Sequence, residues 1–157
     1  MQTKYQVNNI LELETLAQKL VIEWRALTGE KSGAVAVCLT GELGAGKTAF
    51  VKALARALGI KSEPVSPTFV IHQAYSFAAS EAGPAGTLHH LDAYRLKDPV
   101  KDLPPLGFGD MLNERNAIVC IEWGERVAEL LPPGYIEISF EVGEDNQRKI
   151  KILNPKL

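Results

Sequence analysis

The chain has few of the features that mark secreted or membrane-spanning proteins. It contains only two cysteines, Cys38 and Cys120, each inside an apolar run and with no Cys-x-x-Cys pairing. Buried thiols in a reducing compartment are the simplest interpretation, and a disulfide or a metal role is the alternative. No apolar run approaches the roughly 20 residues that cross a bilayer, and residues 1–5 lack the apolar region of a signal peptide. These absences predict a soluble, cytoplasmic protein with no membrane partner.

An excess of charge of one sign is also missing. Seventeen lysines and arginines stand against nineteen aspartates and glutamates, which leaves a formal net charge of −2. A protein that holds nucleic acid by itself needs a visible surplus of basic residues, so this balance argues against one, although it leaves room for a local basic patch. With 157 residues, of which 46% are hydrophobic, the chain predicts a single domain over residues 1–157 with a core of its own.

What the chain does have is a phosphate-binding loop. Residues 41–48 read Gly-Glu-Leu-Gly-Ala-Gly-Lys-Thr, a full match to the pattern G-x-x-x-x-G-K-[ST]. The apolar run over 34–39 predicts a buried strand before the loop, and residues 49–58 predict a helix after it that ends at Gly59. Backbone N–H groups and the positive end of the helix dipole then face the phosphates. The sequence therefore predicts a protein that binds a nucleoside triphosphate.

Each residue type in this loop has an expected task. The glycines allow the backbone to approach the phosphates closely, Lys47 reaches the β- and γ-phosphates, and the Thr48 hydroxyl joins the Mg²⁺ shell. We assign nucleotide binding to Gly41, Leu43, Gly44, Ala45, Gly46, Lys47 and Thr48.

The rest of the chain alternates between helical and strand patterns. Apolar residues from Ile10 to Trp24 recur at helical spacing, with Asn8 or Asn9 as the N-cap and a polar turn expected over 28–33. Strands are predicted over 3–7 at an edge and over 69–77, 87–93, 117–121, 135–142 and 148–153, and short helical pieces over 97–116 and 125–131. The fold class is therefore α/β. We predict a three-layer P-loop NTPase-like domain with a mixed central β-sheet and the nucleotide at the carboxyl ends of its central strands.

Two carboxylates follow predicted strands and are the candidates for metal binding and catalysis. Glu122 comes directly after the apolar run 118–121, where phosphoryl transfer requires an acid near Mg²⁺. Asp92 ends the run 88–91 and could orient the attacking water or help to hold the metal. For either residue the alternative is a strand-end carboxylate that is merely solvated or paired. We assign both as catalytic residues together with Lys47, and Glu122 and Thr48 as the metal ligands.

Other side chains are expected around the same crevice. Arg95 could pair with Asp92 or touch a phosphate. Thr68, in a Ser-Pro-Thr-Phe loop, has a hydroxyl suited to sensing the γ-phosphate, and an ordinary turn threonine is the alternative. Trp123 is expected at the mouth of the crevice or in the core.

The three histidines, at positions 72, 89 and 90, do not form a metal constellation. Neighbouring residues of a strand point to opposite faces of a sheet, so His89 and His90 are not expected to share an ion.

Missing motifs narrow the class of nucleotide-binding protein. The guanine-reading Asn-Lys-x-Asp motif is absent, as is the Asp-x-x-Gly of GTPases, which favours ATP. Small-molecule kinases share the phosphate loop but usually carry an arginine-rich lid, and the five arginines from Arg56 to Arg148 stand singly. The kinase remains the alternative reading. A nucleotide switch without hydrolysis is disfavoured because both Asp92 and Glu122 are present.

Four motifs, in this order, resemble those of the TsaE (YjeE) ATPases. They are Leu43-Gly-Ala-Gly-Lys-Thr, Ser66-Pro-Thr-Phe, His90-x-Asp-x-Tyr-Arg and Ile121-Glu-Trp. The likeness extends to residues 106–108 and to the predicted helix over 125–131, so it spans most of the chain. Members of the family often carry a threonine in the first helix where Leu13 falls here, so no purine contact is assigned to that helix.

The resemblance implies a bacterial ATPase needed to make threonylcarbamoyladenosine, the modified base beside the anticodon of certain tRNAs. In that family the ATPase does not transfer the threonylcarbamoyl group itself. It binds the TsaB–TsaD pair and hydrolyses ATP to reset that complex. The implied cofactors are ATP and Mg²⁺, and the implied partners are homologues of TsaB and TsaD, with tRNA met only through them.

The resemblance also implies roles for individual residues. Lys47 matches the phosphate-binding lysine, Thr48 and Glu122 match the Mg²⁺ ligands, and Asp92 matches a residue required for hydrolysis. Ser66 and Thr68 lie in the segment that responds to the state of the nucleotide. Tyr94, Arg95 and Trp123 are assigned to the rim of the site or to partner contacts.

Overall fold

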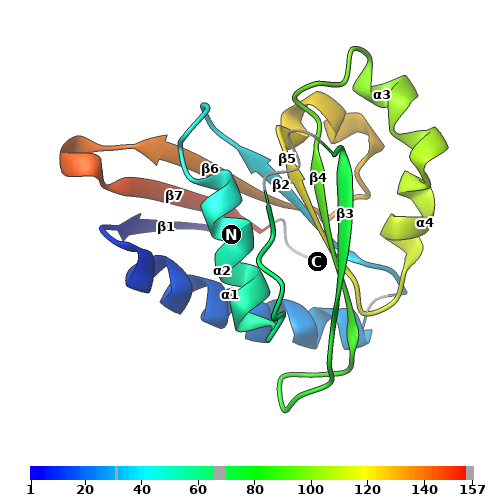
Figure 1. Ribbon diagram of the computed structural model, residues 1–157, viewed down its shortest axis with the longest axis horizontal. Helices are drawn as coiled ribbons and strands as arrows, with labels where there is room; N and C mark the ends of the chain where they lie inside the picture. Colours follow the sequence, from blue (N-terminus) through cyan, green and yellow to red (C-terminus); the bar gives the residue numbers. More distant parts are fainter. Residues whose placement is uncertain (31, 66–69, 155–157) are drawn as a thin grey trace.

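A computed structural model of the chain describes residues 1–30, 32–65 and 70–154. Its strands form one mixed sheet in the order β1-β7-β6-β2-β5-β4-β3 (Figure 1). The strands are β1 (Gln2–Val7), β2 (Val35–Thr40), β3 (His72–Phe77), β4 (Gly86–Asp92), β5 (Ile118–Glu122), β6 (Ile136–Val142) and β7 (Arg148–Leu153). The helices are α1 (Ile10–Glu30), α2 (Lys47–Ala57), α3 (Pro99–Asp102) and α4 (Phe108–Asn113), with 3₁₀ segments η1 (Pro104–Leu106), η2 (Gly124–Leu130) and η3 (Glu144–Asn146).

The centre of the sheet is parallel and its margins are antiparallel. β2 runs parallel to both β5 and β6, and β4 runs parallel to β5. β3, β7 and β1 complete the sheet through antiparallel pairs. Because parallel strands end at the same edge of a sheet, Leu39, Glu122 and Asp92 stand in one row. The predicted mixed sheet is confirmed, and its register brings the two predicted acids onto neighbouring strands.

Helical segments cover both faces of the central strands, which confirms the predicted three layers. Along β2, alternate residues enter two different cores: Val35, Val37 and Leu39 pack with α1 and α2. Ala36 and Cys38 pack on the other face with the segments that follow β4 and β5. Figure 1 shows α3 and α4 grouped together at the far end of the sheet from β1. None of the helices in the described part of the chain is long and apolar enough to cross a membrane.

The first helix begins where the sequence predicts and ends later. Asn9 caps it, because its Oδ1 accepts a hydrogen bond of 3.0 Å from the Glu12 N–H. α1 continues to Glu30, so the prediction of a turn starting at Thr28 is wrong. The Thr28 hydroxyl is buried and donates to the Arg25 carbonyl oxygen at 2.8 Å, which satisfies this polar side chain inside the helix.

The remaining elements follow the sequence patterns closely. α2 ends at Ala57, and Gly59 follows it with φ 73°, the left-handed conformation expected of the residue after a helix. The proline- and glycine-rich stretch over 97–116 contains only the short pieces α3, η1 and α4, as predicted. The helix predicted over 125–131 is the 3₁₀ segment η2.

Candidate functional site

The phosphate-binding loop joins β2 to α2 and lies tightly against β6. Gly41 has φ 136°, and a Cβ added there would lie 2.5 Å from the carbonyl oxygen of Phe140. Gly46 adopts φ 115° immediately before α2 begins at Lys47. Both positions need glycine, one because of the close approach and both because of the backbone angle. The loop thus leads directly into the N-terminus of α2, where the first backbone N–H groups of a helix have no partner within it.

Lys47 is buried and folded back over its own loop. Its Nζ donates to the carbonyl oxygens of Gly41 and of Glu42, the latter at 2.9 Å. The same ammonium lies 4.3 Å from the centre of the Trp123 ring, within the range of a cation–π interaction. Burial lowers the pKa of Lys47, and the nearby carboxylates of Glu122, Glu125 and Asp92 oppose that shift.

Thr48 and Glu122 meet across the loop. The Thr48 hydroxyl donates to Oε1 of Glu122 at 2.8 Å, although the two residues lie 74 positions apart in the chain. Glu122 is the last residue of β5 and is only 4% exposed. A hydroxyl and a carboxylate beside a phosphate loop form an oxygen donor set of the kind that Mg²⁺ takes. The two residues predicted as metal ligands therefore fit that ion.

Asp92 stands directly beside Glu122 on the neighbouring strand. Its side chain is buried, and its Oδ1 accepts a hydrogen bond of 2.9 Å from the Tyr94 N–H. Burial raises the pKa of Asp92, and the bond from Tyr94 works in the opposite direction. The carboxylate is thus fixed in orientation and held in surroundings that favour its taking up a proton.

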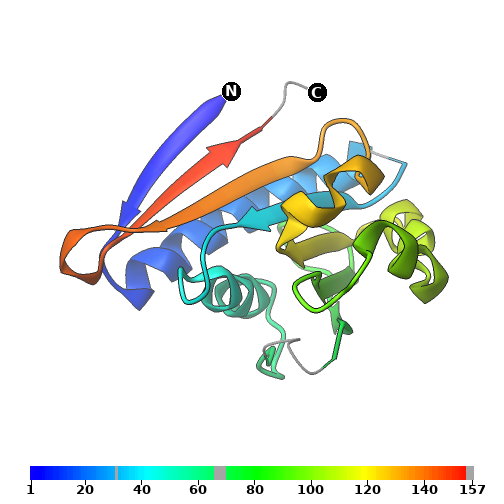
Figure 2. The ribbon, with the colours of Figure 1, turned by 90° about the horizontal axis from the view of Figure 1, so that it is seen from above.

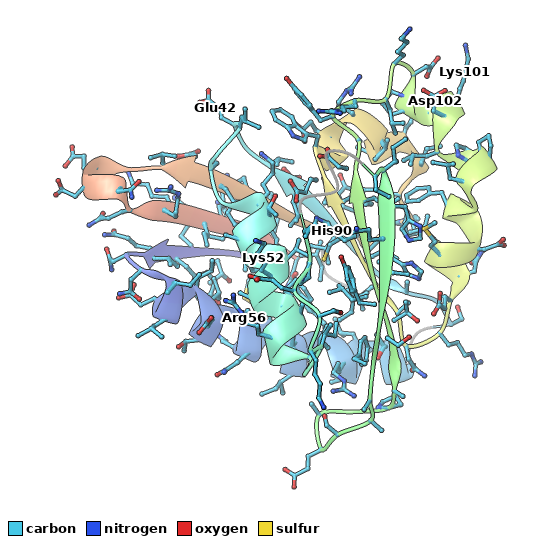
Figure 3. All side chains as sticks on the ribbon, in the orientation of Figure 1. Glu42, Lys52, Arg56, His90, Lys101 and Asp102 are labelled. Carbon is cyan, nitrogen blue, oxygen red and sulfur yellow. The ribbon has the colours of Figure 1, made fainter. Side chains whose placement is uncertain are left out.

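A second donor reaches the Glu122 carboxylate from inside the protein. Nε2 of His90 lies 2.8 Å from the same Oε1 that accepts from Thr48. Figure 3 labels His90 near the middle of the molecule. His90 is fully buried, and its Nδ1 has no hydrogen-bond partner in the described part of the chain.

His89 points to the other face of β4, as predicted. Its Nδ1 lies 2.9 Å from Nε2 of His72, and its Nε2 lies 2.7 Å from Oε2 of Glu114. Adjacent histidines thus take part in two separate groups, and only His90 belongs to the site.

Aromatic and exposed side chains form the rim. The rings of Tyr94 and Trp123 lie 4.9 Å apart, centre to centre, and Tyr94 is 51% exposed. Trp123 has φ 57° and ψ 38°, a left-handed conformation that non-glycine residues seldom adopt. It also packs partly against the core on the side of α3 and α4, so both predicted locations describe it. Leu43, at the tip of the loop, is 81% exposed.

These residues enclose a pocket of about 490 Å³. Its walls carry the loop and both acids: Leu43, Gly44, Gly46, Lys47, Thr48, Ala49, Asp92, Tyr94, Arg95, Glu122 and Trp123. A second hollow of about 280 Å³ shares Gly44, Gly46 and Ala49 with the first and continues toward the start of α1 and the strands β6 and β7. Leu13 and Phe140 belong to its walls.

The chain is similar to known proteins in sequence and in fold. Residues 7–150 match the family model described as threonylcarbamoyl adenosine biosynthesis protein TsaE. The chain belongs to the TsaE family.

Individual members of the TsaE family resemble the chain over most of its length. The TsaE protein of Treponema pallidum is 40% identical over 131 residues, which cover 82% of this chain and 90% of that protein. The TsaE protein of Aquifex aeolicus is 36% identical over 145 residues, covering 91% and 92%. A solved structure, the crystal structure of YdiB from Bacillus subtilis, covers 98% of this chain and is itself covered over 86%, with a TM-score of 0.69 at 24% identity. That structure shares the fold.

Most residues that the sequence singled out for a TsaE-like site lie together. Asp92, Glu122, the rim residues and five of the seven predicted loop residues line one pocket, whereas Gly41 and Ala45 are not part of its walls. Ser66 and Thr68 lie outside the described residues, so their predicted sensor role stays a prediction.

The sequence analysis assigned no role to two residues that contact the site or the segment beside it. His90 contacts Glu122, and Arg126 donates to the carbonyl oxygens of Ala93, Tyr94 and Leu96 in the segment after β4. The two-residue spacing of His90 and Asp92 on one strand was the available signal for His90, because such residues share a face. No comparable sequence pattern near Arg126 indicated its contacts.

Proposed function

We propose that this chain is an ATPase that binds and hydrolyses Mg-ATP in the biosynthesis of threonylcarbamoyladenosine in tRNA. Its membership of the TsaE family supports the pathway. The observation that carries the chemistry is the meeting of Thr48, Glu122 and Asp92 beside Lys47 in one pocket. These groups supply the phosphate cradle, the metal ligands and the acid that hydrolysis of a nucleoside triphosphate requires.

The triphosphate would lie along the phosphate loop. Backbone N–H groups at the start of α2 bind the phosphate oxygens, and Lys47 turns from its own carbonyl partners toward the β- and γ-phosphates. Thr48 and Glu122 would hold the Mg²⁺, which would neutralise part of the negative charge of the phosphates. This arrangement uses the Thr48–Glu122 contact as it stands.

Asp92 is proposed to orient the attacking water. The Tyr94 N–H holds its Oδ1, so the carboxylate is fixed beside Glu122 rather than free to rotate. Burial raises the pKa of Asp92, and a raised pKa suits a carboxylate that receives a proton from water.

The adenine base is proposed to occupy the second hollow. This hollow adjoins the loop at Gly44 and Gly46, and Leu13 and Phe140 give it apolar walls suited to a purine ring. We expect Leu13→Trp to weaken binding of ATP while leaving the affinity for tripolyphosphate, which has no base, unchanged. Calorimetric titration with both ligands measures this, and equal losses for the two would remove the base from this hollow.

Hydrolysis by the chain alone is expected to be slow, and partners are expected to accelerate it. Positioning of the attacking water and an additional cation raise the rate of this type of reaction by several orders of magnitude. The exposed Leu43 and Tyr94 at the mouth of the pocket present apolar surface to a covering partner. We propose that homologues of TsaB and TsaD form that partner and that tRNA is met only through them.

The deciding experiment is phosphate release from Mg-ATP by the purified chain, alone and with the TsaB–TsaD pair and tRNA. We expect a low basal rate, a strong increase with the partners, and repeated rounds of tRNA modification only when this chain is present. Lys47→Ala serves as the control without bound nucleotide. Equal rates with and without partners would contradict the proposal. Mass spectrometry of candidate acceptors would then test for a kinase.

A further inference from the structure

His90 is a fully buried, titratable side chain that the proposed function leaves without a task. Its single polar contact in the described part of the chain is the 2.8 Å approach of Nε2 to Oε1 of Glu122. Burying a polar group costs free energy unless the group is hydrogen-bonded, and His90 satisfies only one of its two ring nitrogens. The contact to Glu122 is therefore the one interaction that compensates for placing an imidazole here.

The direction of this hydrogen bond follows from the groups around it. Oε1 of Glu122 already accepts from the Thr48 hydroxyl, and a carboxylate offers only acceptors. Nε2 of His90 must then carry the hydrogen, so that in the neutral ring Nδ1 is the bare nitrogen. This assignment agrees with the contacts, because Nε2 has an acceptor within reach and Nδ1 has no hydrogen-bond partner in the described residues.

The sheet places His90 behind Glu122, away from the pocket. β4 and β5 are parallel, with His90 opposite Cys120 and Asp92 opposite Glu122. His90 therefore lies two residues before Asp92 on the same face of β4, further from the end of the strand. Asp92 and Glu122 line the pocket, and His90 does not. His90 acts on the site through Glu122.

We propose that His90 is a positioning residue for the magnesium site. It holds Oε1 of Glu122 where the Thr48 hydroxyl can donate to it. The other carboxylate oxygen is then left to bind Mg²⁺ in the pocket. This inference rests on the proposed function, because it assigns Glu122 to Mg²⁺. Partners that orient a metal ligand typically contribute 10- to 100-fold to metal affinity.

The test compares nucleotide affinity with and without Mg²⁺. The dissociation constant of a non-hydrolysable ATP analogue is measured in Mg²⁺ and in EDTA, and the ratio of the two constants reports on the metal site. We expect His90→Leu to reduce this ratio by roughly 10-fold relative to the unaltered chain, with the affinity in EDTA unchanged. His90→Gln should restore most of the ratio, because its amide N–H can reach the position of Nε2.

His89→Leu is the matched control. It removes a neighbouring buried imidazole with contacts to His72 and Glu114, outside the pocket. We expect it to lower the melting temperature and keep the Mg²⁺ ratio. If His90→Leu does not fold, His90→Asn replaces it, since the shorter amide falls short of Glu122; equal ratios for the Asn and Gln variants would overturn the inference.

The outcomes separate the two claims. A Mg²⁺ effect in the unaltered chain that His90→Leu leaves intact would overturn the positioning role, while the proposed metal site would stand. A complete absence of any Mg²⁺ effect in the unaltered chain would overturn the proposed function itself, and the positioning role with it.

Discussion

Lys47 contacts two carbonyl groups and an aromatic ring, and it would have to leave them to bind a phosphate as proposed. Its ammonium group is held by Gly41 and Glu42 and faces the Trp123 ring at 4.3 Å. We expect nucleotide binding to withdraw the charge from the indole and so change the fluorescence of Trp123. The signal is read in a Trp24→Phe background, because Trp24 is the other tryptophan and is completely buried.

Lys47→Ala should abolish both this fluorescence change and ATP binding, since the loop loses its one cation. Lys52→Ala provides the control on the same helix, because that side chain pairs with Glu63 at 3.7 Å and not with the loop. Retained ATP binding by Lys47→Ala would contradict the assignment of this lysine.

Glu122→Ala should separate turnover from affinity. The substitution removes the acceptor of the Thr48 hydroxyl and one proposed metal ligand, while the backbone that cradles the phosphates stays in place. We expect kcat to fall by roughly 100-fold or more, and nucleotide affinity in Mg²⁺ to fall by the smaller factor of roughly 10-fold, with the affinity in EDTA unchanged. Phosphate-release kinetics and calorimetry measure the two quantities.

Glu129→Ala is the control for this measurement, because Glu129 is exposed on η2, the segment that follows Glu122, and does not line the pocket. A Glu122→Ala protein that hydrolyses Mg-ATP normally would move the metal role to another residue.

At the scale of elements, α2 is anchored by Phe50. This residue is completely buried, with its ring centre 6.4 Å from that of Trp24 on α1 and 5.4 Å from that of Phe140 on β6. Phe50→Ala should lower the free energy of unfolding by about 3–5 kcal/mol, because it opens a cavity between three elements. Phe50→Leu keeps most of the volume and should cost less than about 1.5 kcal/mol. Urea denaturation measures both, and equal losses would show that packing at this position does not depend on shape.

The β3–β4 hairpin should make the stability of the protein sensitive to acid. Burial lowers the pKa of His72 from its ordinary value of 6.5, and nearby His89 and His90 lower it further. As the pH falls below about 6.5, the unfolded chain therefore takes up a proton that the folded chain refuses, and stability decreases until the lowered pKa is reached. His72→Gln cannot be protonated and should reduce the loss of melting temperature between pH 7.5 and pH 5.5.

Ala74→Ser is the control on the same strand, since this exposed position does not titrate. An unchanged pH dependence in His72→Gln would assign the acid sensitivity to other groups.

The local elements were largely predictable because each depends on nearby residues. Hydrophobic periodicity located α1, and the prolines and glycines over 97–116 limited that stretch to short helices. The end of α1 was missed because Thr28 and Gly29 are typical of turns, and the burial of the Thr28 hydroxyl depends on tertiary packing.

At the scale of the whole molecule, the order of the strands was beyond the reach of the sequence pattern. β2 lies between β5 and β6, partners that follow it by about 80 and 100 residues, and no local signal specifies such pairing. The approximate place of Glu122 and Asp92 could still be predicted, because both end buried strands. Their exact adjacency, and the reach of His90 to Glu122, depend on β4 and β5 being neighbours.

The first and last strands of the sheet are partners of each other. β1 pairs with β7 along its whole length, and the Met1 amino group donates to the Asn154 carbonyl oxygen at 2.6 Å (Figure 2). During synthesis on the ribosome, β1 is made before β7 and stays without its partner strand until β7 has been made. An unpaired strand edge is a template for association with other chains. The chain is therefore prone to aggregation through β1 from the time this strand is made until β7 is made. A circular permutant that encodes β7 directly before β1 would remove this delay.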